Sequence, residues 1–156
     1  MTLPKFGMIE ATVKATIRPC TEADLPSLEW MGLYTRDRGV IRQAFQAQQR
    51  GEALMLLAVA RGFPIAQVWI DLVAKRRERV AVLWAIRTFF PLQRVGIGSR
   101  MVRAAENAVR NRGYVRAELE VEEVNGAVIA FYRQLGWRVA GKDGGFWTMS
   151  KEINGI

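Results

Sequence analysis

Apolar and polar residues follow two different periods along the chain, and the changes of period divide it into strands and helices. Three apolar runs follow one another in the middle of the sequence and predict strands at 53–60, 65–72 and 80–89. Because only a hairpin-like link and a short charged turn connect them, we expect these strands to be antiparallel neighbours. A further strand is predicted at 11–18, where Pro19 ends it.

Helical spacing predicts two helices before these strands. The first spans about 21–33 and starts with a capping-box-like pair, Thr21 and Asp24. Pro26 lies deep in it, so Asp24 is the alternative cap. The second starts near Val40 and ends at the glycine of position 51.

The second half of the chain alternates helices and strands. Helices are predicted at 97–111 and 126–134, and the residues that we expect to stop or cap them are Gly113, Asn125 and Gly136. Residues 115–121 alternate apolar and charged and predict a strand, and the segments 137–141 and 146–153 predict a final hairpin. We therefore expect a mixed α/β sheet in one domain, residues 11–156, after a flexible tail at 1–10.

The composition excludes several classes of site. The 156 residues contain one cysteine, Cys20, and no histidine, which excludes an internal disulfide, histidine triads and most zinc sites, and we expect no metal. No membrane span and no signal peptide are predicted, so we expect a reducing cytoplasm. The net charge of +8 favours an anionic partner such as a phosphate, a nucleic acid or an acidic protein; a solvated arginine-rich surface is the other interpretation.

The stretch QRVGIG, residues 93–98, lies where a predicted strand gives way to a helix. A helix start has unpaired backbone amides and a partial positive charge, and glycines let a phosphate approach them. Arg94, Arg100 and Arg103 surround the same end. The stretch is not the dinucleotide fingerprint, because position 101 is methionine, and it is not a Walker motif. The alternative is a glycine-rich turn without a ligand.

Three stretches together resemble the GCN5-related N-acetyltransferase (GNAT) family. The spacing of Gln93, Gly96 and Gly98 is similar to the family's Q/R-x-x-G-x-G/A signature. The later stretch NGAVIAFYRQLGW is similar to its second signature, and the opening TIRPCTEADLPSL to its first strand and helix. The resemblance covers residues 12–152. It implies a sheet of about six to seven strands flanked by four helices, with splayed strands forming a cofactor cleft.

The resemblance also implies that acetyl-CoA (coenzyme A) binds between the strands 80–89 and 115–121. The backbone at 88–90 would pair with the pantetheine arm, and the amides at 94–99 would hold the pyrophosphate. The family often has glycine where this chain has Arg94, so we expect Arg94 to serve without a positive φ. The cofactor-binding residues implied are Thr88, Phe89, Phe90, Gln93, Arg94, Val95, Gly96, Ile97, Gly98, Ser99, Asn125 and Tyr132.

The implied reaction moves acetyl directly to a primary amine in a ternary complex. Tyr132 would protonate the departing thiolate; plain packing is its alternative role. Glu120 is the preferred general base, and the other candidates are Glu118, Glu122, Asp71 and a water chain. Cys20 is expected to be a buried filler rather than a nucleophile.

The acceptor is expected to be a small metabolite amine or a peptide N-terminus, with a carboxylate or phosphate as a further group. The resemblance implies that residues 30–42 and 142–147 shape its site. Dimers are common in the family, so a homodimer is one possible assembly, and the sequence leaves the oligomeric state open. Trp69 and Trp84 lie in strands and are predicted to be core. Two other functions stay open: a nucleic-acid-binding module, suggested by the basic cluster at 75–79, and a catalytically silent CoA-binding domain.

Overall fold

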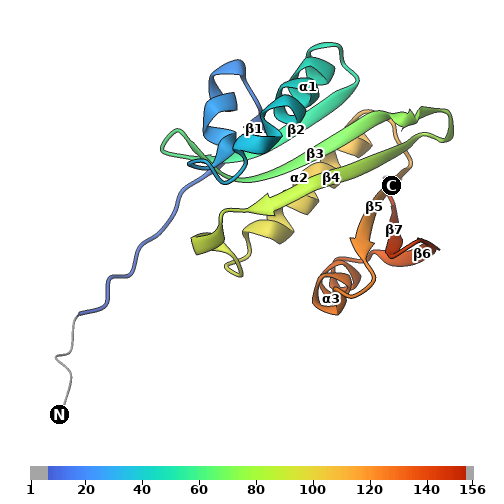
Figure 1. Ribbon diagram of the computed structural model, residues 1–156. Helices are drawn as coiled ribbons and strands as arrows, with labels where there is room; N and C mark the ends of the chain where they lie inside the picture. Colours follow the sequence, from blue (N-terminus) through green and yellow to red (C-terminus); the bar gives the residue numbers. More distant parts are fainter. Residues whose placement is uncertain (1–6, 154–156) are drawn as a thin grey trace.

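The chain folds around one seven-stranded mixed sheet in the order β1-β2-β3-β4-β5-β7-β6 (Figure 1). The structure is a computed structural model, and it describes residues 7–153. Neighbouring strands are antiparallel except β4 and β5, which are parallel. This confirms the predicted mixed sheet. The strands are β1 (Thr16–Pro19), β2 (Ala53–Ala60), β3 (Phe63–Lys75), β4 (Val80–Thr88), β5 (Arg116–Glu122), β6 (Arg138–Asp143) and β7 (Phe146–Glu152).

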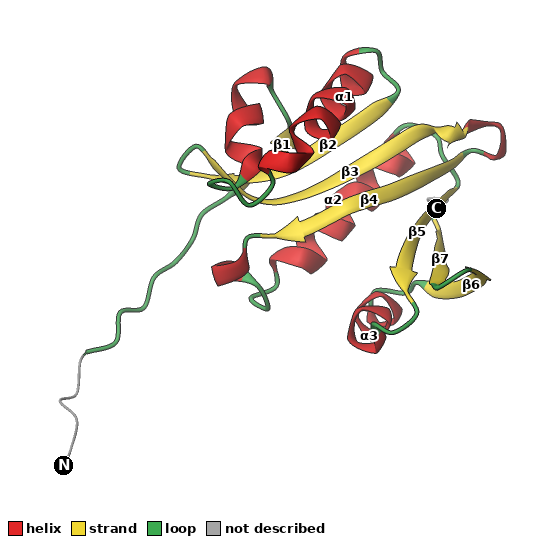
Figure 2. Cartoon of the chain, viewed as in Figure 1, coloured by secondary structure: helices red, strands yellow, loops and turns green. Residues whose placement is uncertain are grey.

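Helices cover both faces of the sheet (Figure 2). The α-helices are α1 (Arg38–Gln49), α2 (Ile97–Asn111) and α3 (Gly126–Gln134), and the last two have the bounds that the sequence predicts. The short 3-10 turns are η2 (Thr35–Asp37), η3 (Arg76–Glu78) and η4 (Phe90–Leu92).

The first predicted helix is shorter than expected and is a 3-10 helix, η1 (Glu22–Glu29). Pro26 removes a backbone donor from its middle, and Trp30 ends it in the left-handed region at φ 45°. The predicted pair at its start is present, since the Asp24 carboxylate accepts the Thr21 backbone N–H at 2.8 Å.

The first strand begins at Thr16 rather than at residue 11. Thr16 pairs with Val59, and β2 turns into β3 one residue later, so residues 11–15 extend past the last strand that could pair with them. Of the predicted tail, residues 1–6 lie outside the described part of the chain, and 7–10 form no helix or strand.

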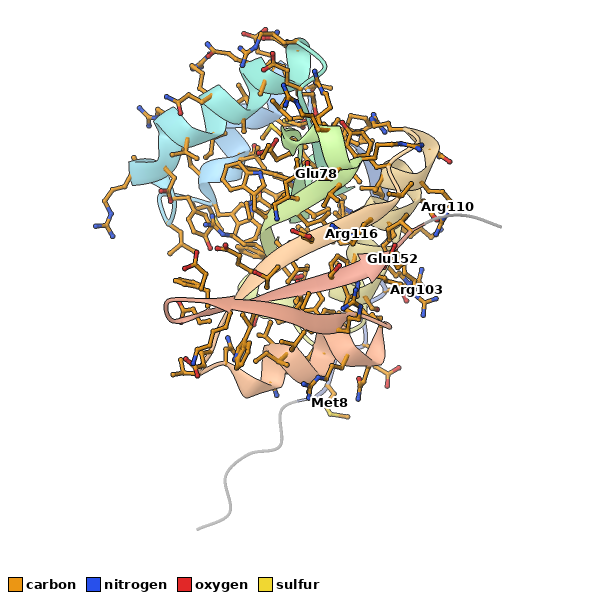
Figure 3. All side chains as sticks on the ribbon, turned by 90° about the vertical axis from the view of Figure 1, so that its right-hand side faces the viewer. Met8, Glu78, Arg103, Arg110, Arg116 and Glu152 are labelled. Atoms are coloured by element: carbon orange, nitrogen blue, oxygen red, sulfur yellow. The ribbon has the colours of Figure 1, made fainter. Side chains whose placement is uncertain are left out.

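The two faces of the sheet are covered to different extents. On one face, α2 and α3 pack on a continuous apolar layer that includes Leu83, Met101, Leu119 and Met149. On the other face, α1 packs on β2 and η1 on β3, over a second cluster that ends at Trp69. Figure 3, turned by 90°, shows Arg116 of β5 beside Glu152 of β7, which are paired in the register of these strands.

The strands β4 and β5 pair only at their beginnings. The parallel ladder covers Val80–Val82 of β4, and beyond it the two strands diverge (Figure 1). In the diverging part, β4 has one more residue than β3 between neighbouring pairs, from Trp69↔Trp84 to Gln67↔Arg87. Ala85 lies in this bulge at φ 50°. A bulge increases twist and bends its strand, so the opening between β4 and β5 is a property of the fold.

Candidate active site

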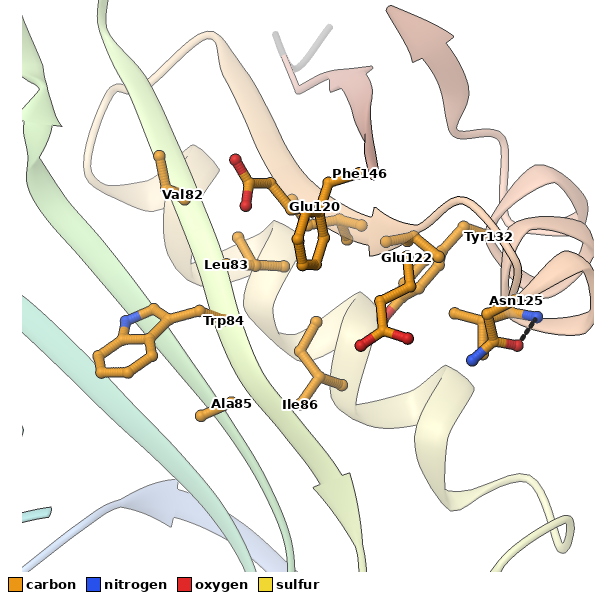
Figure 4. A pocket seen from close by; sticks show the side chains of 13 residues that line it. Val82, Leu83, Trp84, Ala85, Ile86, Glu120, Glu122, Asn125, Tyr132 and Phe146 are labelled. Atoms are coloured by element: carbon orange, nitrogen blue, oxygen red, sulfur yellow. Dashed lines mark hydrogen bonds between the residues drawn. The ribbon is translucent and has the colours of Figure 1, made fainter. Parts of the chain in front are cut away.

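A cleft of about 520 Å³ occupies the space where β4 and β5 separate (Figure 4). Its lining comes from four elements: β4, β5, α3 with its cap, and the start of β7. The lining residues are Val82, Leu83, Trp84, Ala85, Ile86, Leu119, Glu120, Val121, Glu122, Asn125, Val128, Tyr132 and Phe146.

The cleft has two chemically different sides, because successive side chains of a strand point to opposite faces. Leu83, Leu119 and Val121 belong to the apolar layer under α2 and α3. Glu120 and Glu122 alternate with the residues of that layer and point to the α1 side of the sheet. The opening therefore joins an apolar pocket to an acidic one through the plane of the sheet.

Tyr132 lies on the apolar side of the cleft. It projects from α3, is 5% exposed, and packs edge-on against Phe131 and Trp137 with ring centroids 5.1 and 5.8 Å away. Burial raises the pKa of Tyr132 to about 12. Its hydroxyl therefore keeps its proton throughout the physiological range, and the residue both packs and lines the cleft.

Asn125 caps α3 as predicted. Its Oδ1 accepts the Val128 N–H at 3.3 Å, which satisfies one of the free donors at this helix start. It is exposed and lines the cleft, so part of its side chain lies within reach of a ligand there.

The turn before α2 keeps its backbone donors unoccupied by a side-chain cap. Gly96 caps the helix in the left-handed region at φ 89°. Arg94 also has a positive φ, 64°, so the prediction that it would avoid this region is wrong: the turn needs two left-handed residues, whichever side chains they bear. Gln93 Nε2 donates to Thr88 O at 3.2 Å and ties the turn to the end of β4, while Ser99 Oγ donates to Gly96 O at 3.0 Å. Ile97 is the first helical residue, and Val95 is exposed.

Gly98 faces the gap between β4 and α3. A Cβ at this position would lie 3.7 Å from Phe131 Cζ and 3.9 Å from Thr88 Oγ1, which is ordinary contact. A larger side chain would project further into the gap between β4 and α3. Sequence reasoning missed Phe131, although its place beside Tyr132 on a helix facing the sheet was a usable signal.

The backbone at the end of β4 is hydrogen-bonded to β3 along one of its two edges. Phe89 N–H donates to Ile65 O at 2.7 Å, and the Phe89 ring packs between Trp30 and Phe63 at 5.5 and 5.4 Å. Its amide therefore faces β3 and not the cleft. Phe90 begins the turn η4.

The four candidate bases are separated by the fold. Glu118 is buried and forms ion pairs with Lys75 and with Arg116, the latter at 3.4 Å. Asp71 accepts the N–H groups of residues 73 and 74 and lines a separate cavity of about 240 Å³ under α1. Only Glu120 and Glu122 share the cleft with Tyr132.

The family is settled by a family model. The acetyltransferase (GNAT) family model matches residues 10–137, which is most of the chain. The chain belongs to this family. It is an N-acetyltransferase whose cofactor is acetyl-CoA. A sequence search of curated proteins gives no match.

Solved structures share the fold of this acetyltransferase. The PaiA N-acetyltransferase of Thermoplasma acidophilum in complex with coenzyme A has a TM-score of 0.71 at 22% identity, covering 89% of this chain and 99% of that one. The ribosomal-protein-S18-alanine N-acetyltransferase of Escherichia coli has 0.72 at 22%, covering 92% and 96%. The ribosomal-protein-alanine N-acetyltransferase of Brucella melitensis has 0.73 at 20%, covering 88% and 99%.

Of the two tryptophans predicted to be core, one is not core in the structure of the acetyltransferase. Trp69 is core as predicted, at 3% exposed, but Trp84 is 41% exposed and lines the cleft, so its prediction as core is wrong. The reason is that the second cluster ends at Trp69, against whose ring Trp84 packs edge-on at 4.8 Å. Phe146, which lies within the expected acceptor segment 142–147, is 43% exposed and lines the cleft.

The other expected acceptor segment, 30–42, lies outside the cleft, with Trp30 against Phe89 after β4 and Val40 in the separate cavity under α1. Trp30 is buried and packs against Tyr34 at 5.4 Å, and the Arg87 guanidinium lies over the Tyr34 ring at 4.1 Å. Trp147 lines a different cavity beside α3. Of the two segments, only the second contributes a residue to the cleft.

Cys20 of the acetyltransferase is buried, as predicted, and burial raises the pKa of its thiol to about 12. Across residues 7–153, no three His, Cys, Asp or Glu side chains gather as they would around a metal ion. No helix in the same part of the chain is long and apolar enough to cross a membrane.

Proposed function

We propose that this acetyltransferase moves the acetyl group of acetyl-CoA directly to a primary amine, carried by a small metabolite or a peptide N-terminus, in a ternary complex. One observation carries the proposal: the opening between β4 and β5 joins a buried tyrosine on one side to two carboxylates on the other that form no ion pair with any residue of 7–153. The Escherichia coli neighbour's name assigns it an alanine of a ribosomal protein, which supports a peptide acceptor.

The residues around the cleft fit the cofactor. The uncapped start of α2 and the left-handed turn at Arg94 and Gly96 present backbone amides to a pyrophosphate. The gap beside Gly98, bounded by Thr88 and Phe131, suits a narrow chain such as pantetheine. The amides of 94–99 would bind the phosphates, the free edge of β4 the arm, and Asn125 the arm near α3.

Bound acetyl-CoA supplies an activated acetyl thioester. Tyr132 lines the same cleft, and its Oη would donate a hydrogen bond to the sulfur of the departing thiolate. Its pKa of about 12 lies above the roughly 8.5 of a free thiol, but the same apolar surroundings raise the pKa of a thiol held there. Tyr132 thus stays protonated, and its hydroxyl would stabilise the leaving sulfur as a hydrogen-bond donor.

Glu120 is the carboxylate that we assign as general base. It lines the cleft on the acidic side and forms no ion pair among residues 7–153, so it is free to accept a proton from the amine, directly or through water. Glu118 is engaged by Lys75 and Arg116, and Asp71 lies in another cavity, so neither reaches the reacting atoms. The buried Cys20 does not line the cleft, which favours direct transfer without an acyl-enzyme.

The proposed enzyme is a single domain that acts in a reducing cytoplasm. A lone buried thiol fits a reducing cytoplasm, and one continuous sheet fits a single domain. The nucleic-acid alternative loses support, because within the basic cluster at 75–79 Lys75 binds Glu118 and Arg79 donates to Gly113 O. A homodimer stays a prediction.

A matched pair of variants tests the proposal. Titration calorimetry measures coenzyme A binding, and thiol release from acetyl-CoA measures transfer over a panel of amines and peptides. Gly98→Ala should bind coenzyme A within a few-fold of the parent, because its Cβ fits the gap. Gly98→Leu should weaken binding at least tenfold. Equal binding by both variants, or no binding by the parent, contradicts the proposed cofactor position.

A further inference from the structure

We infer that the acceptor carries a second positive charge besides its reacting amine, and that Glu122 together with the ring of Phe146 holds it. The inference rests on the proposed function, and it specifies the class of amine that this opening selects. Its evidence is the pairing, exposure and register of residues on the acidic side of the cleft.

The acceptor must arrive from the acidic side. The α2 turn, Gly98 and Tyr132 all lie on the side of the sheet covered by α2 and α3. A cofactor bound there leaves the opposite side, with Glu120 and Glu122, as the remaining approach to the opening. No α1 or η1 residue lines this part of the cleft among the described residues, so the approach is open.

Glu120 and Glu122 are unpaired while neighbouring carboxylates are not. Glu118 binds Lys75 and Arg116, and Glu123 binds Lys142 at 2.8 Å. Within residues 7–153, Glu120 and Glu122 form no ion pair, although the chain has a net charge of +8. They are two residues apart on one face of β5, roughly 7 Å along the strand, and repel each other until a cation lies between them.

Phe146 supplies an aromatic surface at the same place. It is the cross-strand partner of Glu122, and Thr148, two residues further along β7, is the partner of Glu120. Figure 4 shows the Phe146 ring between the carboxylates of Glu120 and Glu122, whereas the Trp84 ring points away from them. Phe146 is 43% exposed although it is a large apolar residue. An exposed ring beside two carboxylates is a favourable site for an ammonium group.

The chemistry of the reaction requires two separate roles for these carboxylates. The attacking amine must lose its proton, and carboxylates close to an ammonium group stabilise the protonated form and raise its pKa. One carboxylate can take that proton. A second one beside the same amine would oppose the reaction, unless it faces a charge that the acceptor keeps throughout. Glu120 therefore serves the reacting nitrogen and Glu122 the permanent charge.

Two matched pairs of acceptors test the inference by thiol release. The first pair is 1,4-diaminobutane and 1-aminobutane, and the second is alanyl-arginine amide and alanyl-leucine amide, so a small amine and a peptide are distinguished. In at least one of the two pairs, we expect kcat/KM to be at least about tenfold higher for the charged member than for the neutral one. The ratio should fall as ionic strength rises from about 0.05 to 0.5 M, because salt screens exposed charges.

Variants assign the selectivity to residues. Glu122→Gln should reduce the charged-to-neutral ratio of kcat/KM to within about twofold of one, and Phe146→Leu should reduce it two- to fivefold. Glu123→Gln is the control, because Glu123 is next in sequence but does not line the cleft, and it should keep the ratio. An equal loss for both members of a pair would identify Glu122 as a base and overturn the inference.

Failure of the inference is distinguishable from failure of the proposed function. Turnover of all four acceptors without a charge preference overturns the inference and leaves the acetyl transfer standing. If none of the four is turned over, calorimetry with 1,4-diaminobutane and alanyl-arginine amide, with and without coenzyme A, decides: no binding overturns the inference. Absence of coenzyme A binding overturns the proposed function instead.

Discussion

The two faces of the sheet are formed by the same strands, but the apolar layer continues past β4 on only one of them. Under α2 and α3, the apolar layer continues from β2 across to β7 and ends in the pocket that holds Tyr132. Under α1 and η1, the buried residues of the apolar cluster extend only to Trp69 of β3, with Ala85 of β4 partly buried against them, and beyond them β5 exposes Glu120 and Glu122. The first face, called the complete face below, is apolar across the whole sheet. The second, the incomplete face, is apolar only over β2 and β3 and carries the acidic side of the cleft over β5.

The difference shows how one opening between two strands can be apolar on one side of the sheet and acidic on the other. Alternation along β5 gives leucine and valine to one side and glutamate to the other, and the separation from β4 lets both sides meet in one cleft. The complete face supplies a buried apolar layer and Tyr132, whose raised pKa keeps its hydroxyl protonated. The incomplete face supplies two exposed carboxylates, Glu120 and Glu122, that form no ion pair within residues 7–153.

The largest expected effect is on the complete face. Tyr132→Phe keeps the buried ring and removes the hydroxyl, so we expect kcat to fall about 100- to 1000-fold while coenzyme A binding is kept. Steady-state thiol release and calorimetry measure the two quantities. Tyr114→Phe is the control, because the Tyr114 hydroxyl donates to Leu72 O at 2.5 Å and takes no part in the cleft. Equal kcat in both variants would remove Tyr132 from the chemistry.

The next largest effect is expected on the stability of the complete face, at an ion pair that joins α2 to the sheet. Lys151 of β7 binds the buried Glu106 of α2 at 2.5 Å and donates to Leu135 O at 2.7 Å. Lys151→Met leaves a buried carboxylate unpaired, and we expect a loss of about 3 kcal/mol in the free energy of unfolding, measured in urea.

A control for this prediction lies at the edge of the other face. Arg50 and Glu52 form an exposed pair at 3.1 Å, and Arg50→Met should change the unfolding free energy by less than about 0.5 kcal/mol. In a Glu106→Leu/Lys151→Met double variant, most of the loss should be recovered. Similar effects of the two single variants would contradict the expectation that burial makes the Lys151–Glu106 pair the more costly one to break.

A smaller effect is expected for the α1 side and depends on pH. Arg18 donates to both Asp24 oxygens at 2.7 and 2.8 Å, and this hydrogen bonding lowers the pKa of Asp24 from 3.8 to about 2. Because the folded pKa is the lower one, the stabilisation is present above pH 4 and is lost as pH falls toward 2. It amounts to about 2 kcal/mol. Unfolding measured at pH 5, 4, 3 and 2 should show this loss in the parent and a shallower one in Asp24→Asn.

The smallest effect is at the cap of α3, on the rim of the cleft. Asn125→Ala removes the acceptor of the Val128 N–H, and we expect a loss of about 1 kcal/mol in the free energy of unfolding. Asn125→Asp keeps an oxygen at the same place and should lose much less. Equal losses would show that the cap contributes through something other than this hydrogen bond.

Much of the fold was predictable because local signals agree with it. The bounds of α2 and α3 follow from apolar spacing between Gly96 and Gly113 and from the Asn125 cap. The glycine turn before α2 and the family resemblance indicated the cofactor. Two of the wrong predictions, the burial of Trp84 and the φ of Arg94, concern features with no local signal: how far a neighbouring layer extends, and which residues a turn forces into the left-handed region.

By itself the sequence determined the strand and helix order, the alternation that separates glutamates from apolar residues on β5, and the tyrosine of α3. Tertiary structure alone decided which of these glutamates form ion pairs within residues 7–153. Glu118, Glu120 and Glu122 are equivalent in the pattern, but the first lies where β4 and β5 still pair and meets Lys75 from the end of β3, while the others lie where the strands have parted. A residue's charge partner depends on the strands brought beside it, and the spacing of residues along one strand does not encode that.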